Sequence, residues 1–157
     1  MMRRTTLVLM LLVLVAGATQ AQMKTSADVV SATPAASLAT AAAGQRVDFE
    51  IKVDIAQKWH IYAHGDTNFI GVDLVPSEMF PLDDFQAEYP EGHEGEFFGE
   101  KVITIDGKNV IKASAMIPAG MPAGEYPLEF GVTVQACDDK TCLQPVDLPV
   151  AIKLQVK

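Results

Sequence analysis

Cys137 and Cys142 are the only two cysteines of the chain, and they are the residues best suited to chemistry. A disulfide between them would close a ring of only six residues. The loop-entropy estimate for such a short ring is about 2 kcal/mol, against more than about 4 kcal/mol for a bridge that spans a whole domain. Because so short a bridge adds little stability, the pattern favours reactive thiol-disulfide chemistry over reinforcement.

The residues between the two cysteines set the charge around them. Thiolate is the species that attacks a disulfide, and its fraction depends on the local charge. Asp138 and Asp139 disfavour the thiolate, whereas Lys140 favours it. We therefore expect the reduced thiols to be mostly protonated near neutral pH, which suits a carrier that must not reduce unrelated disulfides.

The start of the chain has the pattern of a secretory signal peptide. Arg3 and Arg4 precede an apolar run at 7–16, and small residues allow cleavage after Ala18 or Ala21. The alternative is an uncleaved membrane anchor, but the run is shorter than the roughly 20 apolar residues that span a bilayer. We expect a signal peptide at 1–21 and a periplasmic or otherwise exported protein, not stably inserted in a membrane after cleavage. Disulfides form and persist in such compartments.

The remaining residues, 22–157, are enough for a single domain with its own core. Removal of Arg3 and Arg4 leaves ten basic residues against twenty acidic ones, so the net charge of the mature chain is near −10. This balance argues against nucleic acid and anionic membrane surfaces as partners.

The apolar residues follow the period of β-strands. Val47, Phe49, Ile51, Val53 and Ile55 alternate with charged residues, which predicts a strand with one buried face. Asp106-Gly107 predicts a hairpin turn between two further strands. The stretch at 26–43 is read as either a flexible leader or a poorly patterned first strand. Strands are expected at 47–55, 59–62, 71–75, 85–89, 102–105, 109–117, 126–136 and 146–156.

These short strands, together with nine prolines, eleven glycines and no helical pattern, predict an all-β fold. The expected architecture is an immunoglobulin-like antiparallel β-sandwich. The two cysteines would then lie in a loop at one end of the sandwich, where loops commonly carry function.

Other side chains offer weaker candidates for chemistry. His60, His64 and His93 could join the cysteines as zinc or copper ligands. Their spacing matches no metal-binding pattern, so we interpret them as ordinary surface or loop histidines and expect no metal. The sequence also has no phosphate loop or serine nucleophile elbow, and we expect no bound cofactor. Four glutamates lie in a glycine-rich segment that is read as a solvated loop: Glu91, Glu94, Glu96 and Glu100.

Several motifs resemble the N-terminal domain of the thiol-disulfide interchange protein DsbD. The segment 135–145 (QACDDKTCLQP), preceded by 124–128 (GEYPL), is similar to the active-site hairpin of that family. The segments 58–62 (KWHIY) and 94–99 (EGEFFG) are similar to two further family motifs. The resemblance covers roughly residues 28–157, and it implies an immunoglobulin-like sandwich whose two cysteines cycle between dithiol and disulfide.

The resemblance also implies roles for individual residues. Cys142 would be the sulfur that forms the mixed disulfide with a partner, and Cys137 would resolve it. Phe97 and its neighbour Phe98 would lie in a cap loop that shields the pair, with Tyr62 packed beside it. Because glycine stands at position 95 where the family often has an acidic residue, Glu96 is expected to be the carboxylate near the thiols.

The sequence therefore predicts an exported thiol-disulfide oxidoreductase of the protein-disulfide reductase type. As the resemblance implies, its partners would be thioredoxin-fold proteins and a membrane electron-transfer protein, including those of cytochrome c biogenesis. The membrane and thioredoxin domains usually fused to this module are not in the sequence, so we expect a stand-alone protein with a separate electron donor. The alternative is a non-catalytic immunoglobulin-like binding or assembly module with a structural disulfide.

Overall fold

The computed structural model describes residues 23–66, 68–97 and 99–157 of the chain. The expected signal peptide at 1–21 lies outside these residues. The described part is almost entirely β-structure, and its helical turn is the short 3₁₀ element η1 (Ser26–Asp28). No helix in the described ranges is both long and apolar enough to cross a membrane.

The first sheet of the sandwich has the strand order β1-β3-β9-β6, and its neighbouring strands are antiparallel. As expected, β3 alternates strictly between exposed and buried residues along its ten positions. Such alternation leaves one face of the sheet apolar and the other charged. The strands are β1 (Val30–Pro34), β3 (Arg46–Ile55), β6 (Asp83–Glu88) and β9 (Lys108–Met116).

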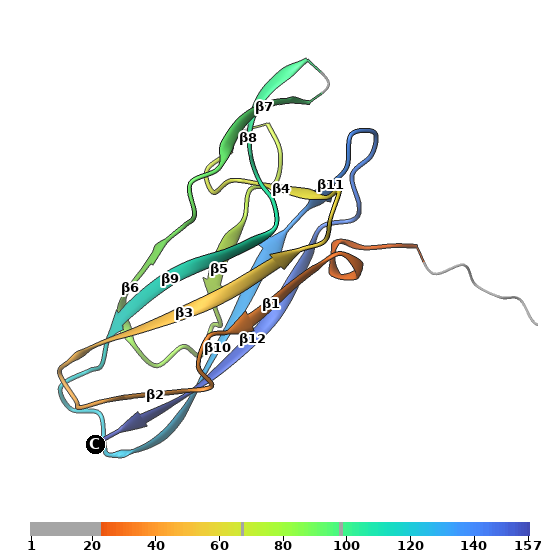
Figure 1. Ribbon diagram of the computed structural model, residues 1–157. Coiled ribbons are helices and arrows are strands. Elements are labelled where there is room, and N and C mark those ends of the chain that lie inside the picture. The colour runs from red at the N-terminus through yellow and green to blue at the C-terminus, as the bar shows by residue number, and fades with distance from the viewer. Residues whose placement is uncertain (1–22, 67, 98) are drawn as a thin grey trace, which may run out of the picture.

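The second sheet has the order β2-β12-β10-β5 and lies behind the first in Figure 1. The strands expected at 126–136 and 146–156 are present as β10 and β12, which form a long antiparallel pair. The edge strand β2 runs parallel to β12. This sheet consists of β2 (Leu38–Ala41), β5 (Asp73–Pro76), β10 (Gly124–Val134) and β12 (Val146–Val156). The stretch at 26–43 is thus structured, because β1 and β2 each add an edge strand to one sheet.

The apolar faces of the two sheets enclose the main core, which we call the body core. It is predominantly aliphatic and draws on both sheets. Its central members are Val47, Phe49, Ile51, Val53, Ile111, Ala113, Leu128, Phe130, Val132, Val134, Val150, Ile152 and Leu154.

A third, smaller sheet at one end of the sandwich has the order β11-β4-β8-β7. It is built where the chain continues beyond strands of the two main sheets, and the β7–β8 hairpin and the loop after β11 project from this end (Figure 1). The strands are β4 (His60–Tyr62), β7 (His93–Phe97), β8 (Glu100–Ile105) and β11 (Ala136–Cys137).

Two sequence predictions are wrong at this end. Asp106-Gly107 does not close a hairpin, because β8 pairs with β4 and β7 whereas β9 pairs with β3 and β6. Gly107, at φ 64°, instead turns the chain from the third sheet into the first. The glycine-rich segment read as a solvated loop contains the strand β7, which pairs with β8 along its whole length.

Candidate redox site

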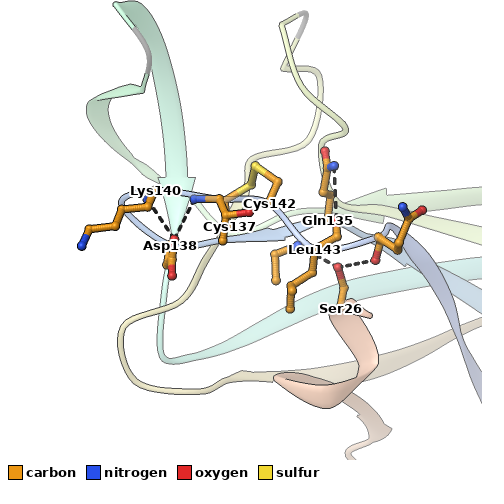
Figure 2. Close-up of a disulfide and its surroundings, with 10 residues drawn as sticks. Ser26, Gln135, Cys137, Asp138, Lys140, Cys142 and Leu143 are labelled. Carbon is orange, nitrogen blue, oxygen red and sulfur yellow. Dashed lines mark hydrogen bonds between the residues drawn. A yellow bond between two sulfur atoms is a disulfide. The ribbon is translucent and has the colours of Figure 1, made fainter. Parts of the chain in front are cut away.

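The two cysteines form a disulfide across a tight turn at the end of the third sheet (Figure 2). Cys137 is the last residue of β11, and Cys142 faces it as an antiparallel bridge partner. The backbone amide of Asp138 donates to the carbonyl oxygen of Thr141 at 2.9 Å, and the amide of Leu143 donates to the carbonyl oxygen of Ala136 at 2.8 Å. These bonds hold the two arms of the cysteine hairpin together on both sides of the disulfide.

Asp138 fixes the turn between the cysteines. Its Oδ1 accepts hydrogen bonds from the backbone amides of Lys140 and Thr141, each at 2.8 Å. Donors aimed at a carboxylate favour its charged form, so these bonds keep the pKa of Asp138 below its usual value. The aspartate that sequence analysis treated only as a charge near the thiols is thus also a structural acceptor.

Ser26 anchors the cysteine hairpin from the other end of the chain. Its hydroxyl donates to the carbonyl oxygen of Gln144 at 2.8 Å and accepts from the amide of Ala136 at 2.9 Å (Figure 2). The amide of Ser26 also donates to the carbonyl oxygen of Gln144, at 2.9 Å. Ser26 is fully buried and joins both arms of the hairpin, a role that sequence analysis missed.

The two cysteine residues differ in their exposure to solvent. Cys137 is 0% exposed, whereas Cys142 is partly exposed. Cys137 belongs to a small group of side chains separate from the body core, which we call the cysteine cluster. Its members are the buried Tyr62, Phe97, Val102 and Cys137, with the partly buried Phe69 and Cys142 packed against them.

Three of the six members of the cysteine cluster are aromatic. The ring of Phe97 lies 6.3 Å from that of Tyr62 and 5.5 Å from that of Phe69, measured between centroids. Tyr62 and Phe69 stack at 4.4 Å. The loop that carries Phe69 returns to β4 at Gly71, where a Cβ would collide with the carbonyl oxygen of Ala63. A glycine is therefore required for this loop to lie so close to β4.

The structure thus brings two of the four proposed shielding residues, Phe97 and Tyr62, together with Cys137. Phe97 is the last residue of β7 and reaches the cluster from the β7–β8 hairpin. Glu96 precedes it on the strand, is exposed, and points to the opposite face, where it lines a cavity with Asp66 and Lys101. The structure does not bring Glu96 to the cysteines. Phe98 lies outside the described residues.

His60 is a further residue at the site. It lies directly opposite Cys137 in the pairing of β4 with β11, so the two side chains project from the same face of the sheet. Its ring meets Tyr62 and Phe97 edge to face, at centroid distances of 5.6 and 5.9 Å. Burial lowers the pKa of His60, although the nearby Asp139 acts against that shift. Sequence analysis missed this pairing of His60 with Cys137, because the two residues lie on strands that are distant in the sequence.

The other two histidines, His64 and His93, make different contacts from those of His60. His93 is exposed, with Nε2 at 3.5 Å from Oδ2 of Asp106, and the ring of His64 stacks on Tyr89 at 3.9 Å. In the part of the chain that the structure describes, no three His, Cys, Asp or Glu side chains are grouped so that they could hold a metal ion.

A family model described as the N-terminal domain of the thiol:disulfide interchange protein DsbD matches residues 26–152. The chain belongs to this family. The match includes both cysteines, Ser26 and every residue of the cysteine cluster. Among curated protein sequences, none matches the chain.

Solved structures of DsbD N-terminal domains and related domains share the fold. The reduced form of the DsbD N-terminal domain from Neisseria meningitidis is 16% identical, with a TM-score of 0.54 over 85% of this chain and 91% of that one. The N-terminal periplasmic domain of ScsB from Proteus mirabilis is 13% identical, with a TM-score of 0.54 over 74% of this chain and 43% of that one. A structure of the complex between the DsbD and PilB N-terminal domains from Neisseria meningitidis matches at 17% identity and a TM-score of 0.47, over 76% of this chain and 80% of that one. The chain thus spans less than half of the ScsB chain, and its immunoglobulin-like sandwich is that of the DsbD N-terminal domain.

Proposed function

We propose that this protein is an exported thiol-disulfide interchange protein that carries electrons through Cys137 and Cys142. Its donor would be a membrane electron-transfer protein or a thioredoxin-like protein, and its acceptors would be exported proteins. Membership of the DsbD N-terminal family supports this role. The description of the related ScsB domain as periplasmic supports the proposed location.

The observation that carries the proposal is the difference in exposure between the two cysteine residues. An incoming thiolate must approach the sulfur that it attacks, and the exchange rate depends on that access. Cys142 is partly exposed, whereas Cys137 is fully buried in the cysteine cluster. We therefore assign the mixed disulfide to Cys142 and the resolving step to Cys137.

The exchange proceeds through two displacements. A partner thiolate attacks Sγ of Cys142, the bond between Cys137 and Cys142 breaks, and Cys137 leaves as a thiolate that takes up a proton. A second partner thiolate then attacks the partner sulfur of the mixed disulfide and releases Cys142. The partner becomes oxidised and the carrier holds two electrons, which the reverse sequence delivers to the next protein. All bonds form between sulfurs, so this chemistry uses no bound cofactor.

A redox titration with mass-spectrometric thiol trapping tests whether the disulfide is reversible. We expect a reduction potential above about −300 mV, the range of exchange-active rather than structural disulfides. The fold should survive reduction, because the six-residue ring contributes only about 2 kcal/mol. A lower potential, together with unfolding on reduction, would establish the alternative of a binding or assembly module with a structural disulfide.

Single-cysteine variants test the assignment of the two sulfurs. Cys137→Ala should trap a mixed disulfide with a thioredoxin-like partner through Cys142, whereas Cys142→Ala should abolish exchange. Peptide mapping of the trapped complex identifies the linked cysteine. A complex trapped through Cys137 in the Cys142→Ala variant would reverse the assignment.

A further inference from the structure

Two buried polar atoms in the described residues have no hydrogen-bond partner: Nε2 of His60 and the hydroxyl of Tyr62. Native structures pair nearly all such atoms, because a buried polar atom without a partner has lost its hydrogen bonds to water and gained none in return. Both atoms belong to β4, and both residues lie beside the cysteine pair. Because both unpaired atoms lie at the same site, we infer that one hydrogen-bonding partner serves both. That partner is absent in the disulfide form and present in another state of the protein.

The geometry of β4 places both residues toward the same cysteine. His60 and Cys137 are directly paired across β4 and β11, and side chains at such positions have Cβ atoms about 4.5–5.5 Å apart. Tyr62 lies two residues further along the same face and is a member of the cysteine cluster with Cys137. In the disulfide, the sulfur of Cys137 has no proton to donate and carries no charge. In the reduced protein, the same sulfur can do both.

We propose that the sulfur of reduced Cys137 is the missing partner, with Nε2 of His60 as its proton acceptor and the hydroxyl of Tyr62 as its hydrogen-bond donor. This assignment rests on the proposed function and adds a residue that handles the proton in the resolving step. Cys142, joined to a partner sulfur, waits for attack by Cys137. The Cys137 thiol gives its proton to His60, and its sulfur attacks Sγ of Cys142. The disulfide forms again, and the partner sulfur leaves as a thiolate that carries the electron pair away.

The surroundings of His60 fit a proton acceptor. An acceptor must be neutral before the step, and burial of the imidazole lowers the pKa of His60. The charged groups that face it are Asp138 and Asp139 from the turn between the cysteines, Asp106 after β8, and His93 on β7. The aspartates oppose the lowering and stabilise the imidazolium once it forms, and His93 acts in the opposite sense. Transfer of a proton to His60 therefore forms a cation that faces carboxylates, although burial works against it.

The test follows the reaction of the reduced protein with 5,5′-dithiobis(2-nitrobenzoate), an aromatic disulfide whose released thiolate absorbs light. The first release, in which Cys142 forms the mixed disulfide, depends on the reagent concentration. The second, in which Cys137 attacks Cys142, does not. We expect His60→Gln and His60→Phe to slow the second release about tenfold or more near neutral pH and to leave the first nearly unchanged. His60→Phe retains an aromatic ring against Phe97 and Tyr62, so the two variants separate loss of the base from loss of packing.

The pH dependence separates proton transfer from a structural effect. In the parent, the second release should be nearly independent of pH between the pKa of His60 and that of the thiol. In the His60 variants it should rise about tenfold per pH unit, because only the spontaneous thiolate then reacts. His64→Gln is the matched control: it removes an imidazole that stacks on Tyr89 and is not among the groups that face His60, so it should change neither phase. Equal second-phase rates and pH profiles in parent and His60 variants would overturn the proton transfer.

Tyr62→Phe tests the hydrogen bond to sulfur. Loss of the hydroxyl should disfavour the reduced form and shift the thiol-disulfide equilibrium about threefold to tenfold toward the disulfide, which lowers the reduction potential by about 15–30 mV. An unchanged potential would overturn this part of the assignment. If the parent itself never gives a second release, the proposed function fails. If the parent gives both phases and the variants behave like it, only the present inference fails.

Discussion

The body core and the cysteine cluster are built from different kinds of side chain. The body core is predominantly aliphatic and joins two long-stranded sheets. The cysteine cluster is small, is half aromatic by residue, and contains the disulfide together with the unpaired hydroxyl of Tyr62. The body core holds most of the buried apolar side chains, whereas the cysteine cluster leaves a buried hydroxyl without a partner beside a disulfide.

The body core and the cysteine cluster also differ in the burial pattern of the strands that contribute to them. Strands of the body alternate between buried and exposed residues, because one face of each sheet is solvated. In the third sheet, adjacent residues are buried together: Ile61 with Tyr62, and Ala136 with Cys137. One residue of each pair belongs to the body core and the other to the cysteine cluster. The third sheet therefore separates the body core from the cysteine cluster, and Cys137 lies on the side of the cluster.

The largest expected effect on stability comes from breaking the body core. Ile111 is 0% exposed and lies opposite Ile51 at the middle of the first sheet. Ile111→Ala should reduce the free energy of unfolding by about 2–5 kcal/mol, measured by urea denaturation, because it removes buried methyl groups and leaves a cavity. The reduction potential should stay unchanged. The neighbouring Val110→Ala, on the outer face of the same strand, should change stability by less than about 0.5 kcal/mol.

The next effect concerns the cluster and is one of rate. Phe97→Ala should expose the disulfide, so that dithiothreitol reduces it about threefold to tenfold faster, since exchange depends on access. The reaction with a protein partner should change less, because docking can displace the hairpin that carries Phe97. Its loss of unfolding free energy should be smaller than that of Ile111→Ala.

Phe85→Ala provides the control, because Phe85 packs on Phe49, Phe80 and Phe130 in the body. It should lower stability without changing the rate of reduction by dithiothreitol. If Phe97→Ala left that rate unaltered and destabilised the protein by about 3–5 kcal/mol, Phe97 would be a packing residue with no shielding role.

The different burial patterns of the strands also explain which parts of the fold could be predicted from the sequence. Alternation identified β3, β10 and β12, because burial on one face imposes period two. It failed at β7, whose first four residues are exposed, and it could not show that the chain changes sheets at Asp106-Gly107. Local turn chemistry indicates that the chain bends, but the choice of pairing partner depends on contacts distant in sequence.

The residues of the candidate redox site divide in the same way into those that local sequence reveals and those that depend on distant contacts. The cysteines stand out by type and spacing, and the family resemblance pointed to Tyr62 and Phe97. Ser26 could not be found in this way, because its bonds reach Ala136 and Gln144 across 110 and 118 residues. The sequence Thr25-Ser-Ala-Asp28 is a pattern typical of a helical start, which indicates the turn but not its contact with the cysteine hairpin.

Ser26 links the two regions, and its removal should have an intermediate effect. Ser26→Ala leaves the amide of Ala136 without its acceptor in a buried place, so we expect a loss of about 1–3 kcal/mol in the free energy of unfolding. Hydrogen exchange at Ala136 and Leu143 should accelerate more than exchange in β3. Ser31→Ala, at an exposed position of β1, is the matched control and should be nearly neutral. Uniform acceleration throughout the sandwich would show that Ser26 supports the whole fold rather than the cysteine hairpin.

The smallest expected effect is confined to the turn between the cysteines and depends on pH. Because the folded protein lowers the pKa of Asp138, its carboxylate contributes stability that is fully present above the unfolded value of about 4 and is lost as the pH falls through the folded value. The difference in unfolding free energy between parent and Asp138→Ala should therefore be constant near neutrality and shrink in acid, as measured by urea denaturation across a pH series. Asp139→Ala removes a carboxylate from the same turn but leaves the bonds to Lys140 and Thr141 in place. If both variants gave the same difference at every pH, the hydrogen bonds of Asp138 would not be the cause.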